Sequence, residues 1–595
     1  MENTKKQSLL NGAMILSVAI IAVKIISFLF RIYVTNKITF QGSGLYSVAY
    51  NIYVPIYSIA LAGLPTAVSK MVASEAALGN YHNVKRLFSV SNLLFAFLGV
   101  VGTAVLLLAA YPFSKSVGQP DATLSIICIA PSLFFCCVMS GYRGYYQGLR
   151  NMNPTAVSQI FEAAGKLIFG WLFIHMVLGS ALALPDVIPL TKIRISDTRS
   201  AYASAAAILG VTVGSLMGLL YLLARQRVKS DGITKALLES SPAAEERKAL
   251  TRRLIKIAIP ISISALVFNL TTFIDNWTVL KCLDIVLDKH FDTVAAMYPQ
   301  IAEANGYLAY SPETASAFKA YLIGAYDNVL EIKNVVPTFT IAFGLSALPV
   351  LSESWTKKDM PAVHSAIESV IRLSMLIAFP AGVGMMVLSE DLLQLLFGLS
   401  VYNAPGIPYV APILMMYGVS VCFLALAQPL VSTLQAVDRM RDPIIAMTIG
   451  AVLKVVANMV LVSIPTVNIQ GAVYGSILCN IVMVVYAMVV LAKTTKLRYD
   501  FMSDFGRPLL CAVISGAAAW LTNSLFDRFL PPSGLTHIHE ILSADNLACV
   551  AGVFAAVVFY VIALFLVRAI PKDDVVMLPK GDKIARFMEK HGFLR

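Results

Sequence analysis

Apolar residues run along this chain in long stretches that are separated by short polar connections. Each stretch has close to the ~20 residues that a helix needs to cross the hydrocarbon core of a bilayer. Because a spanning segment must satisfy its own backbone hydrogen bonds, we expect these stretches to be α-helices. The pattern predicts about fourteen spans, at residues 12–35, 44–69, 87–112, 122–147, 155–181, 200–225, 254–281, 328–352, 366–388, 408–433, 443–464, 469–492, 507–525 and 547–569.

Lysine and arginine are concentrated in every second connection. The basic set includes Lys85, Arg150, the stretch 226–253, Arg439 and the tail after residue 570. The connections between them are poorer in basic residues or acidic, although the one around Arg194 fits this alternation badly. Since cytoplasmic loops carry the excess of positive charge, we expect both termini in the cytoplasm.

One sequence pattern occurs twice. The first copy is GYYQGLRNMNP, followed by an apolar helix that carries Lys166; the second is LQAVDRMRDP, followed by a helix that carries Lys454. Gln435 lies 288 positions after Gln147, and Lys454 lies 288 positions after Lys166. The chain is therefore predicted to be a duplication. Six spans separate the copies, so the two halves are expected to be parallel repeats.

This repeat divides the chain into predicted domains. An N-terminal lobe of six spans covers residues 1–225, and a cytoplasmic linker covers 226–253. A C-terminal lobe of six spans covers 254–492, with an outer insertion at 284–326 that we expect to contain short helical pieces. Two further spans lie in 493–570, and 571–595 form a basic cytoplasmic tail.

Composition supports a polytopic membrane protein. Hydrophobic residues make up 58% of the 595 residues and charged residues only 13%, against ~25% in soluble domains. The net charge of +12 lies in short loops, so it does not indicate nucleic-acid binding. The eight cysteines show neither pairing nor metal-ligand spacing. Nothing resembles a catalytic constellation, a cofactor motif or a metal site, so we do not expect an enzyme.

Charged residues inside the spans are the candidates for function, because a charge in the bilayer core is unfavourable without a partner, water or a role. Lys24 and Arg31 lie seven residues apart on one face of the first helix. Arg31 could instead snorkel to the outer headgroups. Lys166 and Lys454 are repeat mates, which predicts that they face one central cavity. Glu162, four residues before Lys166, is a further candidate substrate-binding residue, and it could instead neutralise Lys166.

Two further charges have open interpretations. Asp275 follows Asn269 and Thr272 in the seventh span, where it could bind a cation or cap the outer helix end. Arg143 could be an anchor at the inner face. Taken together, the spans hold more cations than anions. Lysine and arginine in a low-dielectric cavity favour an anionic, phosphate-bearing substrate.

At four segments the chain resembles a known family: KIISFLFR, GSGLYSVAY, GYYQGLRNMNPTAVSQIFE and AIPISISALVFNLTTFID. They are similar to the polysaccharide-transport branch of the multidrug/oligosaccharidyl-lipid/polysaccharide (MOP) exporters, particularly to stage V sporulation protein B and MurJ-like lipid II flippases. The resemblance implies two six-helix lobes in a V, two added helices, and export of undecaprenyl-pyrophosphate-linked saccharides by alternating access.

The resemblance also carries over to single positions. Lys24 falls where MurJ-like proteins have a functional arginine in the first helix. Arg31 lies one residue later than the second cation of that helix. The acid and arginine expected around the second helix are absent, and Glu331, Lys333 and Asn334 replace the arginine and glutamate before the proline of helix 8.

These observations lead to one functional hypothesis and two alternatives. The chain is predicted to be a flippase of the bacterial plasma membrane, with a lipid-linked oligosaccharide, most of all lipid II, as substrate. Its partners would be membrane lipids and a coupling ion, Na⁺ or H⁺, without a cofactor or nucleic acid. The alternatives are a cation-coupled multidrug exporter and a non-transporting scaffold of cell-wall or spore assembly.

Overall fold

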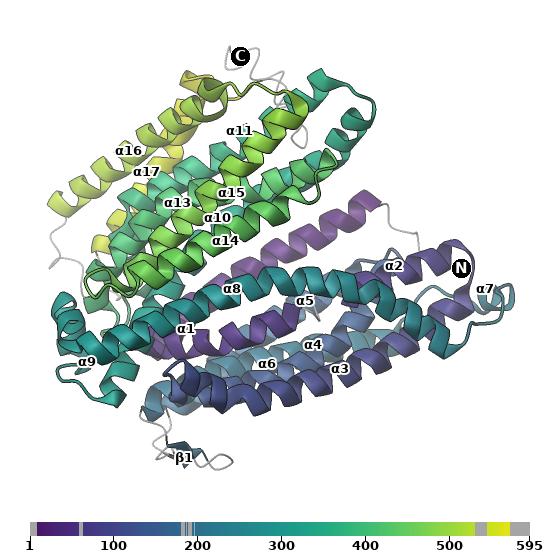
Figure 1. Ribbon diagram of the computed structural model, residues 1–595, viewed down its shortest axis with the longest axis horizontal. Helices are drawn as coiled ribbons and strands as arrows, with labels where there is room; N and C mark the ends of the chain where they lie inside the picture. Colours follow the sequence, from purple (N-terminus) through teal and green to yellow (C-terminus); the bar gives the residue numbers. More distant parts are fainter. Residues whose placement is uncertain are drawn as a thin grey trace. The chain divides into compact units, whose positions relative to one another are not determined.

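The computed structural model describes residues 9–58, 64–179, 185, 187–188, 193–194, 197–529 and 544–571, and these residues are almost entirely α-helical (Figure 1). The helices before the midpoint are α1 (Leu9–Ser58), α2 (Leu64–Ala77), α3 (Tyr81–Ser116), η2 (Pro120–Ala122), α4 (Thr123–Gly148), α5 (Asn153–Gly179), α6 (Thr198–Val228), α7 (Lys235–Glu239), α8 (Arg247–Met297) and α9 (Pro299–Asn305). Those after it are α10 (Pro312–Thr356), α11 (Met360–Val387), α12 (Ser389–Phe397), η3 (Ala404–Gly406), α13 (Ile407–Ala436), α14 (Asp442–Leu461), η4 (Asn468–Gln470), α15 (Gly471–Thr495), η5 (Met502–Gly506), α16 (Arg507–Phe529) and α17 (Ala544–Leu566). The strands β1 (Val187–Ile188) and β2 (Ile193–Arg194) form one short antiparallel hairpin.

The predicted all-α membrane fold is confirmed. Among the described residues, eleven helices are long and apolar enough to cross a membrane. Helices α8 and α10 overlap two further predicted spans but are not among the eleven. The total of fourteen spans therefore stays a prediction.

Helix α1 contains a break that separates the first two predicted spans. Thr39 has φ 66° and ψ 174°, which is outside the helical region. In a straight helix, Arg31 and Ser47 would lie ~24 Å apart at 1.5 Å per residue. Their side chains are instead hydrogen-bonded at 3.4 Å, and Thr35 bonds Ser43 at 3.1 Å. The chain thus turns sharply at Thr39 and brings its two halves together.

Two compact units make up the chain. The first comprises residues 1–284 and 310–324, and the second comprises 285–309 and 325–595. In the first unit, α4 packs against α2, α3 and α6, while α5 packs against α1 and α6. In the second unit, α13 packs against α11 and α15, and α16 packs against α11 and α17 (Figure 1). Helices α8 and α10 extend well into the predicted insertion 284–326, where α9 is the one short helix between them.

The units repeat the same order of elements, which bears directly on the duplication. A 3₁₀ turn precedes both α4 and α13, and these helices end at Gly148 and Ala436, 288 positions apart. Two residues beyond each helix end, the backbone is left-handed, at Arg150 (φ 58°) and Asp438 (φ 62°). The next helix then has proline as its second residue in both units, Pro154 and Pro443. Equivalent residues can therefore be compared between the units.

Candidate functional site

Lys166 lies where α5 crosses α6 at very short range. A Cβ atom at Gly214 of α6 would lie 2.7 Å from the Lys166 backbone nitrogen, and one at Gly210 would lie 2.4 Å from the Cα of Gly170. Only glycine permits this approach, which fixes the backbone that carries the lysine. The Lys166 ammonium lies 5.0 Å from the centre of the Phe30 ring of α1, in a cation–π contact.

Lys454 also lies beside a glycine of the neighbouring helix in the second unit. A Cβ atom at Gly475 of α15 would lie 3.2 Å from the Lys454 carbonyl oxygen and 3.4 Å from its Cγ. Both lysines are half-buried and stand on the first helix of a tightly packed pair. The equivalence inferred from the repeat thus extends to the packing around each lysine, within its own unit.

Glu162 pairs with Arg143 and not with Lys166. The Arg143 Nη2 atom lies 2.8 Å from a Glu162 carboxylate oxygen, and its Nε donates to the Ser158 hydroxyl at 3.0 Å. The Arg143 side chain is 6% exposed and that of Glu162 is 24% exposed. The pair joins α4 to α5. Neutralisation of Lys166 by Glu162, one of the two alternatives, is therefore wrong, and Arg143 is more than a surface anchor.

Arg31 is buried rather than snorkelling. Its guanidinium lies 5.0 Å from the ring centre of Tyr46 and donates to the Ser47 hydroxyl. Tyr46 stacks in turn on Tyr50, with 4.8 Å between ring centres. The turn at Thr39 creates this arrangement, since it folds the aromatic half of α1 back over the arginine.

Lys24 is exposed on the first half of α1. Its neighbours Ile20, Ile21 and Ile25 are exposed as well, so the lysine stands on an apolar surface. Arg31 lies in a different environment, although both residues belong to the same predicted face. The structure thus separates an accessible cation from a buried one.

Lys333 of α10 is a buried cation that the sequence analysis treated only as a departure from the family pattern. Its side chain is 7% exposed, and its ammonium lies 4.4 Å from the ring centre of Tyr417. The Tyr417 hydroxyl contacts the hydroxyls of Tyr326 at 2.7 Å and Ser476 at 3.3 Å. The signal available beforehand was the run YDNVLEIKN, which places charges in a predicted span.

The candidate cation site on α8 is described only in part. Asp275 is buried and Asn269 is half-buried, while the side chain of Thr272 lies outside the described residues. The adjoining Asn276 donates to the amide oxygen of Asn51 at 2.7 Å, which ties α8 to the second half of α1. Cation binding at Asp275 therefore stays a prediction.

An apolar pocket lies against the part of α5 that follows Lys166 in the sequence. It has a volume of about 300 Å³ and is lined by Tyr33, Leu167, Ile168 and Trp171. The Tyr33 hydroxyl is 2.9 Å from Nδ1 of His175, which fixes the ring at the pocket wall. The first unit thus places a lysine beside a surface suited to hydrocarbon.

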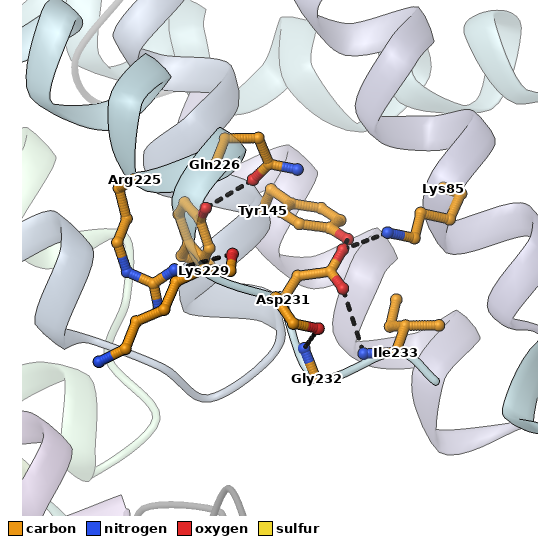
Figure 2. Close-up of polar contacts among 10 residues, drawn as sticks. Lys85, Tyr145, Arg225, Gln226, Lys229, Asp231, Gly232 and Ile233 are labelled. Atoms are coloured by element: carbon orange, nitrogen blue, oxygen red, sulfur yellow. Dashed lines mark hydrogen bonds and ion pairs between the residues drawn. The ribbon is translucent and has the colours of Figure 1, made fainter. Parts of the chain in front are cut away.

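The tyrosines of the repeated pattern bind the linker between the predicted lobes. Figure 2 shows the Tyr145 hydroxyl donating to the Asp231 carboxylate, at 2.6 Å, while Lys85 pairs with the same carboxylate. Tyr146 donates to the Gln226 side chain at 2.5 Å. Burial alone would raise the pKa of Asp231, but the bonds from Lys85, Tyr145 and a backbone amide hold it below its ordinary value of 3.8.

Glu75 forms a second anchor for this linker. Its buried carboxylate accepts from Asn80 at 2.9 Å, from Asn83 at 3.0 Å and from Arg253, at the start of α8, at 2.8 Å. Burial would raise the pKa of Glu75, but these donors lower it below its ordinary value of 4.5. The linker is thus held to the first unit at both of its ends.

The Glu75 anchor predicts an acid-sensitive attachment of the linker. A carboxyl whose pKa is lowered on folding stabilises the folded state above its unfolded pKa, and this contribution is lost as the pH falls through the lower, folded value. We expect Glu75→Gln to weaken the attachment by ~2 kcal/mol at neutral pH. Hydrogen exchange of residues 229–246, corrected for the intrinsic rate at each pH, measures this.

The exchange experiment compares the protection of the linker in wild type and in Glu75→Gln at several pH values. Wild-type protection should decline in acid, whereas Glu75→Gln should be less protected at pH 7 and should change less with pH. Glu239→Gln, at an exposed position of the same linker, is the matched control and should behave as wild type. Equal protection of wild type and Glu75→Gln would show that the anchor does not hold the linker.

Comparisons with known proteins agree with this architecture. The family model described as "Polysaccharide biosynthesis protein" matches residues 9–355, and the model for "Lipid II flippase MurJ" matches residues 332–539. "Stage V sporulation protein B" of Bacillus subtilis (strain 168) is 25% identical over 583 residues, covering 96% of this chain and 98% of the relative.

Two solved structures share the fold. A structure of the lipid II flippase MurJ in an inward closed conformation has a TM-score of 0.59 at 13% identity and covers 93% of this chain and 99% of its own. A multidrug resistance MATE transporter of the MOP superfamily in an inward-facing conformation has a TM-score of 0.57 at 13% identity. The match covers 80% of this chain and 96% of the MATE chain.

The fold and the comparisons define a multi-pass membrane protein that shares the fold of the MurJ and MATE structures. More narrowly, the chain belongs to the polysaccharide biosynthesis protein family, whose model spans more than half of it. The resemblance inferred from sequence is confirmed.

Proposed function

We propose that this protein is a flippase that exports an undecaprenyl-pyrophosphate-linked saccharide, most of all lipid II, across the bacterial plasma membrane. The observation that carries the proposal is the pair Lys166 and Lys454, each held at a glycine-packed helix crossing of its own unit. Repeated cations inside apolar helices suit a substrate with two phosphates. The lipid II flippase model and the MurJ structure support the same substrate class.

Each cation has a proposed role. The pyrophosphate would meet Lys24, Arg31 and Lys454, with Lys166 as a further contact, while the prenyl tail would remain in an apolar environment. The apolar pocket beside Lys166 fits that division between charge and hydrocarbon. The two units would alternate in access around the substrate, with both termini in the cytoplasm. Asp275, Asn269 and Thr272 are proposed as the site of a coupling cation.

A multidrug exporter would need a carboxylate in its spans that is not part of an ion pair, so that it can attract a cationic drug. Glu162 is the candidate carboxylate for that role within a predicted span, and it is paired with Arg143. A scaffold would have no requirement for lysines at matched crossings. Both alternatives therefore have less support than an exporter of anionic lipids.

Depletion of the protein tests the proposal. If it exports a lipid-linked saccharide, cells depleted of it should accumulate that precursor in the inner leaflet, where an impermeant enzyme or reagent added outside does not reach it. Lipid extraction and mass spectrometry identify the saccharide. Re-expression of wild type should return the precursor to its normal level. Unchanged precursor levels and accessibility, in a strain without a second flippase, would contradict the proposal.

A further inference from the structure

In the first unit, the helices beside the repeated hinge (residues 147–154) pack closely together. Helix α2 packs so tightly against α4 that a Cβ atom at Gly144 would lie 2.9 Å from the Cβ of Val68. A Cβ atom at Gly148 would lie 2.6 Å from the Cβ of Val72. Met71, on the same helix, is buried as well. Valines and a methionine on glycines leave little space between these helices.

At the equivalent position of the second unit there is a pocket. Gly144 and Gly148 are replaced 288 positions later by Ser432 and Ala436, so both positions carry a side chain in the second unit. The apolar residues of α2 are replaced 284 positions later by polar or larger ones on α10: Val68 by Ser352, Met71 by Trp355 and Val72 by Thr356. The pocket here has a volume of about 360 Å³ and lies between the end of α10 and the hinge after α13. Such a volume lies within the ~300–1,000 Å³ of small-molecule sites.

The pocket combines one aromatic ring with several hydrogen-bonding groups. Its walls are formed by Leu348, Ser352, Trp355, Thr356, Gln435, Ala436, Asp438 and Met440. The Trp355 indole N–H donates to the Asp438 carboxylate at 3.2 Å, which fixes the ring. The left-handed backbone at Asp438 directs that residue to the indole, whereas its first-unit counterpart is Arg150. The Asp438 carboxylate can accept further hydrogen bonds. The Gln435 amide and the hydroxyls of Ser352 and Thr356 can both donate and accept.

We propose that this pocket binds a saccharide ring of the transported substrate, an inference that rests on the proposed function. A pyranose has one face of C–H groups and an edge of hydroxyls. The C–H face can stack on the electron-rich indole face of Trp355, while the hydroxyls bond Asp438 and Gln435. The Asp438 carboxylate disfavours a phosphate, so the pocket selects the neutral saccharide and leaves the pyrophosphate to the lysines of the spans.

The pocket's place in the chain indicates when it acts. The hinge that contains Arg439 and Arg441 belongs to the connections whose basic charge predicts a cytoplasmic position. Lipid-linked saccharides are collected on that side before export. The pocket would therefore hold the saccharide of an arriving substrate and raise its apparent affinity, without taking part in the crossing itself.

Binding of a soluble disaccharide to the purified full-length protein tests the site. With N,N′-diacetylchitobiose as the probe, saturation-transfer NMR should give a saturable signal for wild type. Trp355→Ala should weaken binding at least tenfold, since it removes the stacking surface, and Trp355→Phe should restore part of it. Asp438→Ala should also weaken binding. Trp520→Ala is the matched control, because Trp520 is exposed on a different helix, and it should bind as wild type.

A transport assay separates this site from the proposed function. In proteoliposomes, Trp355→Ala should raise the apparent KM for a lipid-linked saccharide several-fold and leave kcat unchanged. Thermal melting of each variant reports whether it is folded, and Gln435→Ala provides a milder change in the same pocket. No saturable signal from wild type, or equal binding by wild type and Trp355→Ala, would overturn the site while transport by wild type still upheld the function. Saccharide binding by a wild-type protein that transports nothing would instead overturn the function.

Discussion

Arg143→Ala is expected to destabilise the protein by ~3 kcal/mol, because it leaves the Glu162 carboxylate without its charged partner in a membrane-embedded helix pair. The arginine is almost fully buried and also holds the Ser158 hydroxyl, so alanine removes two interactions between α4 and α5. The glutamate is partly exposed, and this keeps the expected loss at the lower end of the range for broken buried pairs. Thermal unfolding in detergent, followed with a thiol-reactive dye on the buried cysteines, measures the change.

Replacement of both partners separates the pair from simple packing. The double variant Arg143→Met with Glu162→Leu keeps apolar volume and removes both charges, so it should recover most of the stability lost in Arg143→Ala. Arg252→Ala changes an exposed arginine of the same unit and should leave the unfolding midpoint within experimental error. A midpoint for Arg143→Ala equal to wild type would show that the pair contributes nothing to the first unit.

The sequence predicted the features that depend on composition and on repetition. Long apolar stretches identify membrane helices because a bilayer imposes their length, and the spacing of Gln147, Pro154 and Lys166 identified the duplicated hinge. The structure extends that duplication to helix ends and left-handed residues that no pattern displays. The resemblance read from four short segments agrees with the family model that matches more than half of the chain.

The partners of charged residues could not be predicted, because they depend on tertiary packing. Glu162 has Lys166 four residues later on its own helix, yet its carboxylate meets Arg143 from α4. For Arg31, the sequence left a functional role and snorkelling to the outer headgroups both open, and the break at Thr39 buries the residue against Tyr46. Lys333 lies in a predicted span, and its ammonium contacts the ring of Tyr417 on α13, 84 positions later in the chain. Local spacing in the sequence identifies candidate ion pairs, and tertiary packing determines which of them form.

The same limit applies to the difference between the two units. The replacement of Gly144 and Gly148 by Ser432 and Ala436 is visible in the sequence once the repeat is aligned. The pocket lined by Trp355 and Asp438 at that place can be recognised only once the helices are placed against each other. Divergence between repeats is therefore a useful guide to sites, provided that the packing is known.

Lys24→Gln is expected to abolish export and leave the protein abundant in the membrane. The lysine is exposed on an apolar face of α1, so the fold does not depend on contacts of its ammonium group. Lys24 lies at the middle of the predicted span 12–35, where a charge is unfavourable by ~2.5–3.5 kcal/mol on insertion scales, so its removal should ease insertion. If the ammonium holds the pyrophosphate, glutamine removes a charged partner of that anion, whereas Lys24→Arg keeps the charge and should retain more export.

Arg31 provides the contrast that makes this result interpretable. Because Arg31 is buried on Tyr46 and Ser47, Arg31→Ala should lower both the amount of folded protein and export, whereas Lys24→Gln should lower export alone. Complementation of a flippase-depleted strain at matched membrane levels measures the two effects, and Lys70→Gln, at an exposed lysine of α2, is the control. Full growth with Lys24→Gln would remove Lys24 from the substrate site and leave the anion to Lys166 and Lys454.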